Sequence, residues 1–414
     1  MAATHDTDPA NRPAQGGSFD TELVKMALVL GLMALIGPFA IDMYLPALPT
    51  IAADLATDPS VVQLTLTVYF LAFGVSQIVY GPISDMVGRK PPIYFGLGLF
   101  AVTSIGCAMA PTIEALVALR FLQGLGAAAV MSIPRAIIRD RYTGPRATRL
   151  MSTVMLVISV SPMLAPLAGS FVIDAFGWRT VFLAVTVGTG LSLLLNLFVL
   201  PETLAPGNRV PVDFGGMFRA FGTLLKDLNF MGLKLIGGAG MGAFFTFLGS
   251  ASFVYMDHFG LSPRDFAIAF AANAAGFFLA TQFSATILAR LGAARLMQAA
   301  SVSYAAVVIV LFALFAVGLG SLPLMIGLLV FSNLFMGLII PSAMVMSLEE
   351  HGAIAGAAAS LGGTLQMVTA SVAMVIGGLM FDGTPLPMLG IIAVCGAIAA
   401  VLALVTVRTT SSTA

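Results

Sequence analysis

The sequence predicts an all-α membrane protein with twelve transmembrane helices, arranged as two pseudo-symmetric six-helix bundles. Hydrophobic residues make up 59% of the chain, charged residues make up 9%, and the mean hydropathy is +1.01. In a soluble domain, by contrast, about 25% of the residues are charged. Apolar runs of about 20 residues, the length that crosses a bilayer, recur from end to end. The basic residues gather in alternate loops, as the positive-inside rule predicts for an even number of spans.

A polar linker at 201–228 divides the expected spans into two sets of six. We therefore expect bundles at 22–200 and 229–407. The polar segments 1–21 and 408–414 are expected to be cytoplasmic tails, the first of them disordered, and residues 1–20 lack the pattern of a cleavable signal peptide. The first six spans are expected at 23–48, 60–80, 92–110, 114–135, 149–174 and 179–200, and the second six at 229–256, 265–289, 295–317, 322–347, 353–380 and 386–407.

Basic residues fix the expected orientation. If the N-terminus is cytoplasmic, only Arg179 and Arg264 fall in outer loops. Both termini are therefore expected to be cytoplasmic. The residues on the inner side are Arg89, Lys90, Arg139, Arg141, Arg146, Arg149, Arg209, Arg219, Lys226, Arg290 and Arg295.

Several function classes find no support in the composition. The formal net charge is zero, so nothing indicates a nucleic-acid partner. The two cysteines, Cys107 and Cys395, lie in apolar runs and are interpreted as buried hydrophobic residues. The spans contain no cluster typical of a metal site, a bound cofactor or a nucleophile with its base, so an enzyme is not expected.

The two halves echo each other. "GSFVID" (169–174) closes the fifth span and "GGLMFD" (377–382) closes the eleventh, 208 residues later. "DMVGRK" (85–90) follows the second span, and "ARLGAAR" (289–295) follows the eighth. A repeat of six spans is typical of many secondary transporters.

The loop "GPISDMVGRK" (81–90) carries the most specific motif in the chain. Gly81 and Gly88 permit tight turning and close approach. Asp85 can cap a helix or pair with a basic residue. Arg89 and Lys90 would satisfy the positive-inside rule by themselves, but the whole string resembles the signature loop of the major facilitator superfamily.

Further motifs extend this resemblance from about residue 22 to 407. "LRFLQGLGAA" (119–128), with Arg120, resembles the superfamily's fourth-helix motif. "SPMLAPLAG" (161–169), with Pro162, Pro166 and Gly169, resembles the fifth-helix motif of its antiporters, although Ala165 replaces the usual glycine. Four stretches are similar to the bicyclomycin/chloramphenicol-resistance (Bcr/CflA) type of drug/proton antiporter: "DMYLPALP" (42–49), "FGWRTVF" (176–182), "PET" (201–203) and "FDGTPLPM" (381–388).

The resemblance implies two six-helix bundles around one cavity, lined by the first, fourth, seventh and tenth spans, in a bacterial inner membrane. It implies that Asp85 caps the start of the eleventh helix near 352–356 and, with Arg89, holds the cytoplasmic side shut in one state. The second half has Ala289 at the position of Asp85, so this latch would be one-sided. The implied partners are lipophilic drugs, protons and membrane lipids, and a monomer is expected.

Asp42 is the one acid within the first span. It follows Lys25 by 17 residues, about 25 Å along a helix, and so lies in the outer half. A charge within a span costs at least about 2.5–3.5 kcal/mol and is kept for a reason. We interpret Asp42 as a proton carrier; the alternative is a wet, interfacial carboxylate.

Arg120 is expected at a compatible depth in the fourth span, with Gln123 on its face. Because arginine does not lose its proton, it is not the carrier. Either it tunes Asp42 or it ties the helix to backbone carbonyl groups. Candidate substrate contacts are Phe39, Tyr44, Gln123, Phe245 and Asn333, since aromatic residues and methionines repack around varied ligands.

These observations predict a proton-coupled antiporter that exports lipophilic drugs by alternating access, with one proton for each drug. A metabolite exporter on the same scaffold is the alternative, but a sugar site needs more hydrogen-bonding side chains than this chain offers. A membrane enzyme or a sensor is a third reading, for which no site or extra domain is evident.

Overall fold

The computed structural model describes residues 21–211, 213–349 and 354–407, and every regular element within them is helical. Twelve helices in these ranges are long and apolar enough to cross a membrane. The predicted all-α membrane fold is therefore confirmed. Apart from Thr21, the segments expected to be tails lie outside the described residues.

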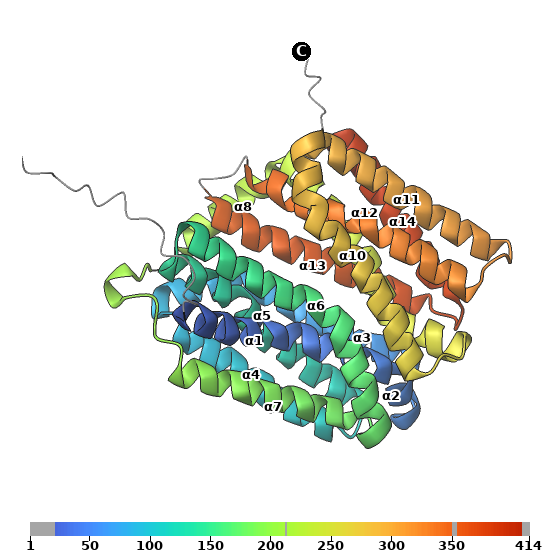
Figure 1. Ribbon diagram of the computed structural model, residues 1–414, viewed down its shortest axis with the longest axis horizontal. Helices are drawn as coiled ribbons and strands as arrows, with labels where there is room; N and C mark the ends of the chain where they lie inside the picture. Colours follow the sequence, from blue (N-terminus) through green and yellow to red (C-terminus); the bar gives the residue numbers. More distant parts are fainter. Residues whose placement is uncertain (1–20, 212, 350–353, 408–414) are drawn as a thin grey trace, which may run out of the picture.

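The first bundle, shown in blue to green in Figure 1, contains seven α-helices and a short 3-10 helix. They are α1 (Thr21–Asp42), η2 (Leu45–Ala47), α2 (Leu48–Asp54), α3 (Pro59–Val87), α4 (Lys90–Met109), α5 (Ile113–Arg141), α6 (Gly144–Phe176) and α7 (Arg179–Phe198).

The second bundle follows a linker that itself contains two short helices, η3 (Pro206–Asn208) and α8 (Phe214–Lys226). Its elements are α9 (Leu228–Ser252), the π-helical turn η4 (Phe253–His258), α10 (Pro263–Leu291), α11 (Ala293–Ala316), α12 (Leu322–Glu349), α13 (Ala355–Leu379) and α14 (Pro385–Thr406). We call the end of the molecule that carries α8 the linker end and the opposite end, which carries α2, the far end (Figure 1).

The first span is broken near its prolines. Pro38 is accommodated inside α1, but the regular helix ends at Asp42 and resumes only in η2 and α2. Pro46 has no N–H to donate to the carbonyl group of Asp42, and its ring crowds that carbonyl. Asp42 is consequently the last residue of α1, beside a break rather than within a continuous helix.

The structure supports the internal repeat. Gly88 ends α3 and Gly292 ends α10, and both have positive φ angles, 100° and 77°. Gly169 brings α6 against Met43, while Gly377 brings α13 against Thr246 of α9. Corresponding glycines thus have corresponding roles in the two bundles.

The halves contact each other through α3 with α13 and through α6 with α10. Phe70 of α3 stacks on Phe245 of α9, with ring centroids 3.8 Å apart. Thr364 of α13 donates a hydrogen bond to the carbonyl of Gly74, at 2.7 Å. From the middle of the bundle to the far end the halves are closed, whereas at the linker end α3 and α13 line two cavities of about 440 Å³ and about 700 Å³.

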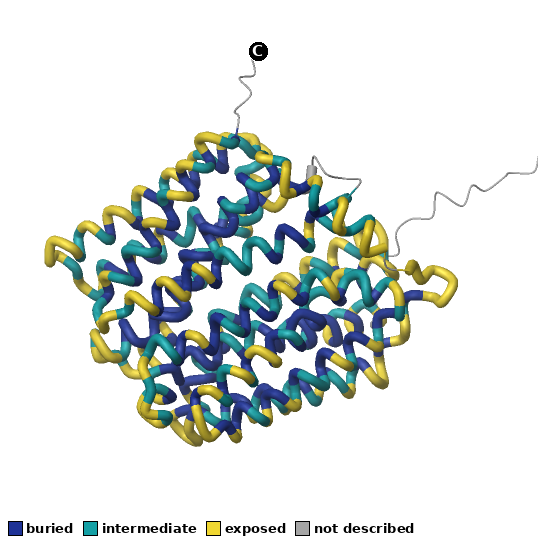
Figure 2. The backbone as a smooth tube through the Cα atoms, turned by 180° about the vertical axis from the view of Figure 1, so that it is seen from behind, coloured by how far each residue is buried: buried dark blue, intermediate teal, exposed yellow. Residues whose placement is uncertain are grey.

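Buried residues lie along the inner faces of the helices, and exposed residues gather at the helix ends and on the outer surface (Figure 2). That outer surface retains large apolar side chains, such as Val102, Val187 and Leu194. A surface of this kind is suited to contact with lipid chains.

Candidate functional site

Asp42 lies in the interior of the first bundle, with only 5% of its surface exposed. Its carboxylate accepts one hydrogen bond, from the Ser161 hydroxyl of α6, at 3.3 Å. No Lys, Arg or His among the described residues pairs with it within 4.0 Å. The predicted proton carrier is thus a buried acid with a single hydroxyl partner.

Arg120 is completely buried, and it is bound to α1 through Ala40 and not through Asp42. Its Nη1 donates to the Gln123 side chain at 2.6 Å and to the carbonyl of Ala40 at 3.4 Å. Gln123 donates in turn to Ser104 of α4, at 2.7 Å. The geometry therefore contains the backbone tie that the sequence left as an alternative, and it contains no ion pair between Arg120 and Asp42.

An aromatic cage surrounds the Arg120 guanidinium. Its central carbon lies 4.7 Å from the ring centroid of Tyr44 and 4.6 Å from that of Tyr69, with Phe182 at 5.9 Å. Cation–π attraction partly replaces the water that the charge has lost. Tyr44 is held in place by a 2.9 Å hydrogen bond with Thr65.

A separate pocket of about 230 Å³ lies between the two bundles. Its walls come from α6, α9, α10 and α12, and none of the described side chains that line it is ionisable. Asn333 donates a hydrogen bond to Asn273 across the pocket, at 3.2 Å, and Phe247 stacks on Phe270 with centroids 5.7 Å apart. The lining residues are Ile158, Ser159, Pro162, Met241, Phe244, Phe247, Phe270, Asn273, Ala274, Phe277, Asn333, Met336 and Ile340.

One turn of α6 touches both the acid and this pocket. Ile158, Ser159 and Pro162 line the pocket, while Ser161, between them in the sequence, binds Asp42. The buried carboxylate and the apolar pocket are thus connected through adjacent residues of one helix.

The five predicted substrate contacts are not brought together. Asn333 lines the pocket between the bundles, whereas Phe39 faces a groove formed by α1, α6 and α7. Tyr44 and Gln123 are buried inside the first bundle. Phe245 packs on Phe70 and is not part of the pocket wall.

Most of the residues that line the pocket were not predicted from the sequence, and neither was the contact of Ser161 with Asp42. In "GAFFTF" the residues that line the pocket are Phe244 and Phe247, which follow Met241 at helical spacing. That periodicity would have favoured them over Phe245. Nothing in the local sequence pairs Ser161 with Asp42, 119 residues away.

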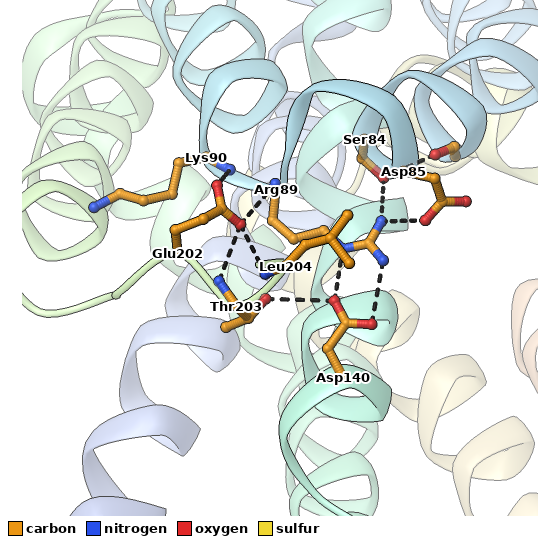
Figure 3. A network of polar contacts seen from close by, with 9 residues as sticks. Ser84, Asp85, Arg89, Lys90, Asp140, Glu202, Thr203 and Leu204 are labelled. Carbon is orange, nitrogen blue, oxygen red and sulfur yellow. Dashed lines mark hydrogen bonds and ion pairs between the residues drawn. The ribbon is translucent and has the colours of Figure 1, made fainter. Parts of the chain in front are cut away.

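The loop at 81–90 forms a polar network at the linker end (Figure 3). Arg89 is almost completely buried and binds Asp85 at 2.6 Å, Asp140 of α5 at 2.7 Å and the Ser84 hydroxyl at 2.7 Å. This network joins the ends of α3 and α5. Lys90 takes part through its backbone, while its side chain lies over Tyr94.

Glu202 of the "PET" stretch completes the network in Figure 3. Burial raises the pKa of this carboxyl, but four backbone N–H donors lower it by more, so its pKa lies below the usual value. Gly88 is required here because its φ is +100° and because a Cβ atom would lie 2.7 Å from the carboxylate. The four donors belong to Arg89, Lys90, Thr203 and Leu204, at 2.9–3.1 Å.

A cavity of about 440 Å³ lies between this network and the second bundle. Gly81, Asp85 and Arg89 line one side of it, and Gly356 and Ser360 of α13 line the other. Asp85 binds Arg89 here and makes no hydrogen bond to a described residue of α13. Part of the segment that it was expected to cap, 352–353, lies outside the described residues.

Comparison with known proteins identifies a family and relatives that match most of the chain. A family model described as the Major Facilitator Superfamily matches residues 30–374. The chain is 34% identical over 373 residues to an uncharacterized MFS-type transporter, YdgK, of Bacillus subtilis, covering 89% of this chain and 91% of the relative. It is 30% identical over 375 residues to a bicyclomycin resistance protein homolog of Haemophilus influenzae, covering 89% and 92% of the two chains.

Two further comparisons agree with these. A chloramphenicol resistance protein of Pseudomonas aeruginosa is 31% identical over 276 residues, which is 66% of this chain and 65% of the relative. A crystal structure of a D-xylose-proton symporter superposes with a TM-score of 0.74 at 16% identity, covering 94% of this chain and 99% of that one. At that identity the structural match establishes the fold alone.

Proposed function

Because this chain belongs to the major facilitator superfamily, we propose that it is a proton-coupled antiporter that exports lipophilic drugs, with Asp42 as the proton carrier. The observation that supports this best is the buried Asp42 carboxylate, which has a Ser161 hydroxyl but no cation as its partner. An acid in this setting has one obvious use in a transporter, which is to gain and lose a proton.

The cost of burying a charge explains the choice of residue. A carboxylate within a span costs at least about 2.5–3.5 kcal/mol, and the neutral acid costs much less. Asp42 is charged while the cavity admits water and neutral when the cavity closes around it. Arg120 is not the carrier, because arginine does not lose its proton in proteins; its Nη1 donates to Ala40 and Gln123, and aromatic rings surround the guanidinium.

The drug occupies the pocket between the bundles. Its phenylalanines and methionines form an adaptable apolar wall, and the Asn273–Asn333 pair offers amide groups for orientation. Two relatives are named for resistance to bicyclomycin and to chloramphenicol, and chloramphenicol is an uncharged molecule with an aromatic ring. A pocket without an ionisable side chain suits ligands of that kind, whereas it offers too few polar groups for a sugar.

The linker end faces the cytoplasm in this proposal, in keeping with the basic loops. Drug enters through the cavities at that end while Asp42 is charged, and the two bundles then rock about the pocket. A proton from outside neutralises Asp42 and drug leaves. The network around Arg89 and Asp85, which closes against α13 while the cavity faces outward, then parts from α13 as the protonated carrier returns. With one acid, one proton moves for each drug, and the proton gradient drives export if the two ligands disfavour each other.

The test uses purified protein in liposomes with an imposed pH gradient. We expect Asp42→Asn to abolish uphill accumulation of chloramphenicol while downhill exchange of the drug continues. Asp257→Asn, at an exposed acid near the far end, is the matched control and should pump normally. Uphill transport by the Asp42→Asn protein at the wild-type rate would remove Asp42 from the mechanism.

A further inference from the structure

The turn of α6 around Pro162 contains the residue that hydrogen-bonds to Asp42 and also residues that line the pocket between the bundles. We propose that this turn is the coupling element of the antiporter, and that Ser161 is the positioning residue through which drug and proton exclude each other. This inference rests on the proposed function, since it needs Asp42 to be the proton carrier and the pocket to hold the drug.

The backbone of this turn is unusually free to adjust. Pro162 has no N–H to donate to the carbonyl of Ile158, and Pro166 has none for the carbonyl of Pro162. Two helical hydrogen bonds one turn apart are therefore missing, and both affected carbonyls belong to residues that line the pocket. Figure 1 shows α6 bent along its length, as prolines in a helix produce.

About two turns beyond Ser161, α6 is held against Met43, the residue that follows α1. A Cβ atom at Gly169 would lie 2.4 Å from the carbonyl oxygen of Met43, so the two backbones are in direct contact there. Met43 directly follows Asp42 at the break in α1. Movement of the Pro162 turn relative to this contact point changes the distance between the Ser161 hydroxyl and the carboxylate, which is 3.3 Å in this structure.

The hydroxyl of Ser161 donates to Asp42 and not to a carbonyl group of its own helix. Other serines on α6 bond to their own helix: Ser159 donates to the carbonyl of Met155, and Ser170 donates to that of Leu167. Ser161 is 1% exposed, and its hydroxyl donates to Asp42. Ser170 is the matched control, because Ser170→Ala removes a hydroxyl from the same helix at a residue that contacts neither the acid nor the pocket.

The sign of the coupling follows from the strength of the hydrogen bond in each state. A hydroxyl bound to a charged carboxylate is held more strongly than one bound to the neutral acid. Drug in the pocket packs against Ile158 and Pro162 and so keeps the Ser161 hydroxyl hydrogen-bonded to the charged Asp42 carboxylate. Protonation releases Ser161, the turn moves into the pocket, and drug affinity falls. The expected difference between the two states is about tenfold in drug affinity.

Few other ionisable groups act on Asp42. Tyr69 of α3 interacts electrostatically with both Asp42 and Arg120, and Arg120 of α5 is bound to Ala40 and Gln123. The charged residues of α6 and α7 lie near the helix ends: Arg146, Arg149, Asp174 and Arg179. Ser161 is thus the one group that bonds to the carboxylate and also belongs to the pocket-lining turn.

The experiment measures equilibrium binding of chloramphenicol, which does not itself titrate, to purified protein across a pH series without a gradient. Wild-type protein should bind about tenfold more tightly at high pH than at low pH. Ser161→Ala should bring this ratio close to one. Ser161→Thr, which keeps a hydroxyl, should preserve the ratio, and so should Ser170→Ala. Drug binding should also release protons into a weak buffer. This release should be smaller in Ser161→Ala than in the wild type, and it should be unchanged in the other variants.

The contrary outcomes are distinct. An unchanged ratio in Ser161→Ala would overturn the coupling role, as would equally weakened binding at every pH, because that is the effect of a purely structural residue. If the wild-type protein showed no pH dependence and Asp42→Asn changed nothing, the proposed proton coupling itself would fail. Absence of chloramphenicol binding at any pH would instead count against the proposed pocket and drug class.

Discussion

Gly169 offers the sharpest test of how α1 and α6 are packed. We expect Gly169→Ala to destabilise the protein and to impair transport, because the added Cβ atom would lie 2.4 Å from the Met43 carbonyl oxygen and 2.9 Å from its Cα atom. Both contacts are to backbone, so no side chain can rotate away. Ordinary contact begins at 3.4 Å, and the two helices must therefore separate by about 1 Å at this point.

The size of the effect follows from this overlap. Overpacking in a close-packed interior costs about 1–3 kcal/mol. The displacement also moves Asp42, which precedes Met43, away from Ser161. Gly190→Ala is the matched control: it lies in α7, and its Cβ atom would meet nothing within 4 Å. Any change in helix propensity is common to both variants, so the difference between them measures the overlap.

The assay can use the protein's own thiols. Cys107 and Cys395 are free and buried, so a thiol-reactive fluorophore labels them only as the protein unfolds on heating. Gly169→Ala should be labelled at a lower temperature than Gly190→Ala, and liposome transport should fall only in the former. If the two proteins melted together and pumped equally well, the close approach of α1 and α6 would be wrong.

Two further predictions concern the pocket and the linker. Asn333→Leu should weaken chloramphenicol binding about tenfold, because it removes the half-buried amide and takes away the Asn333 donor of the Asn273 side-chain oxygen. Binding of tetraphenylphosphonium, which has no hydrogen-bonding group, should stay unchanged. Equal losses for both ligands, measured by equilibrium binding, would contradict a role in orientation. Glu202 has a lowered pKa, so its contribution to stability is complete above the unfolded-state pKa and is lost as the pH falls through the lower folded-state pKa. Acid should therefore expose the segment 201–211 of the wild type to proteolysis, and Glu202→Gln should expose the same segment at neutral pH. Equal protection of the two proteins from protease at pH 7 would refute this.

Much of the architecture was predictable because it depends on local composition. The twelve spans follow from runs of apolar residues, and their observed ends differ from the predicted ends by a few residues in most cases. The largest differences are at α1, where prolines stop the helix at Asp42, at α3, which continues to Val87, and at α5, which continues to Arg141. Hydropathy alone registers neither the missing N–H groups of proline nor the polar network that holds the end of α3 in place.

The candidate site was only partly predictable. Asp42 stands out in the sequence because a charge in an apolar span is rare. Its partner does not stand out, because a serine is unremarkable in a helix. Helical spacing groups Phe244 and Phe247 with Met241 and apart from Phe245, but only the structure shows that this face of α9 meets α6 and α10. The sequence also suggested that Arg120 acts on Asp42, whereas the guanidinium is bound to Ala40 and Gln123 instead.

By itself, then, the sequence determined the membrane class, the division into two bundles and the identity of the buried acid, because each of these is set by the cost of placing polar groups in hydrocarbon. Only the tertiary structure decided that Ser161 is the group bound to that acid and that the drug-sized pocket shares a helical turn with it. Such pairings join residues far apart in the chain and depend on how close two helices approach, which Gly169, Pro162 and the break after Asp42 set together.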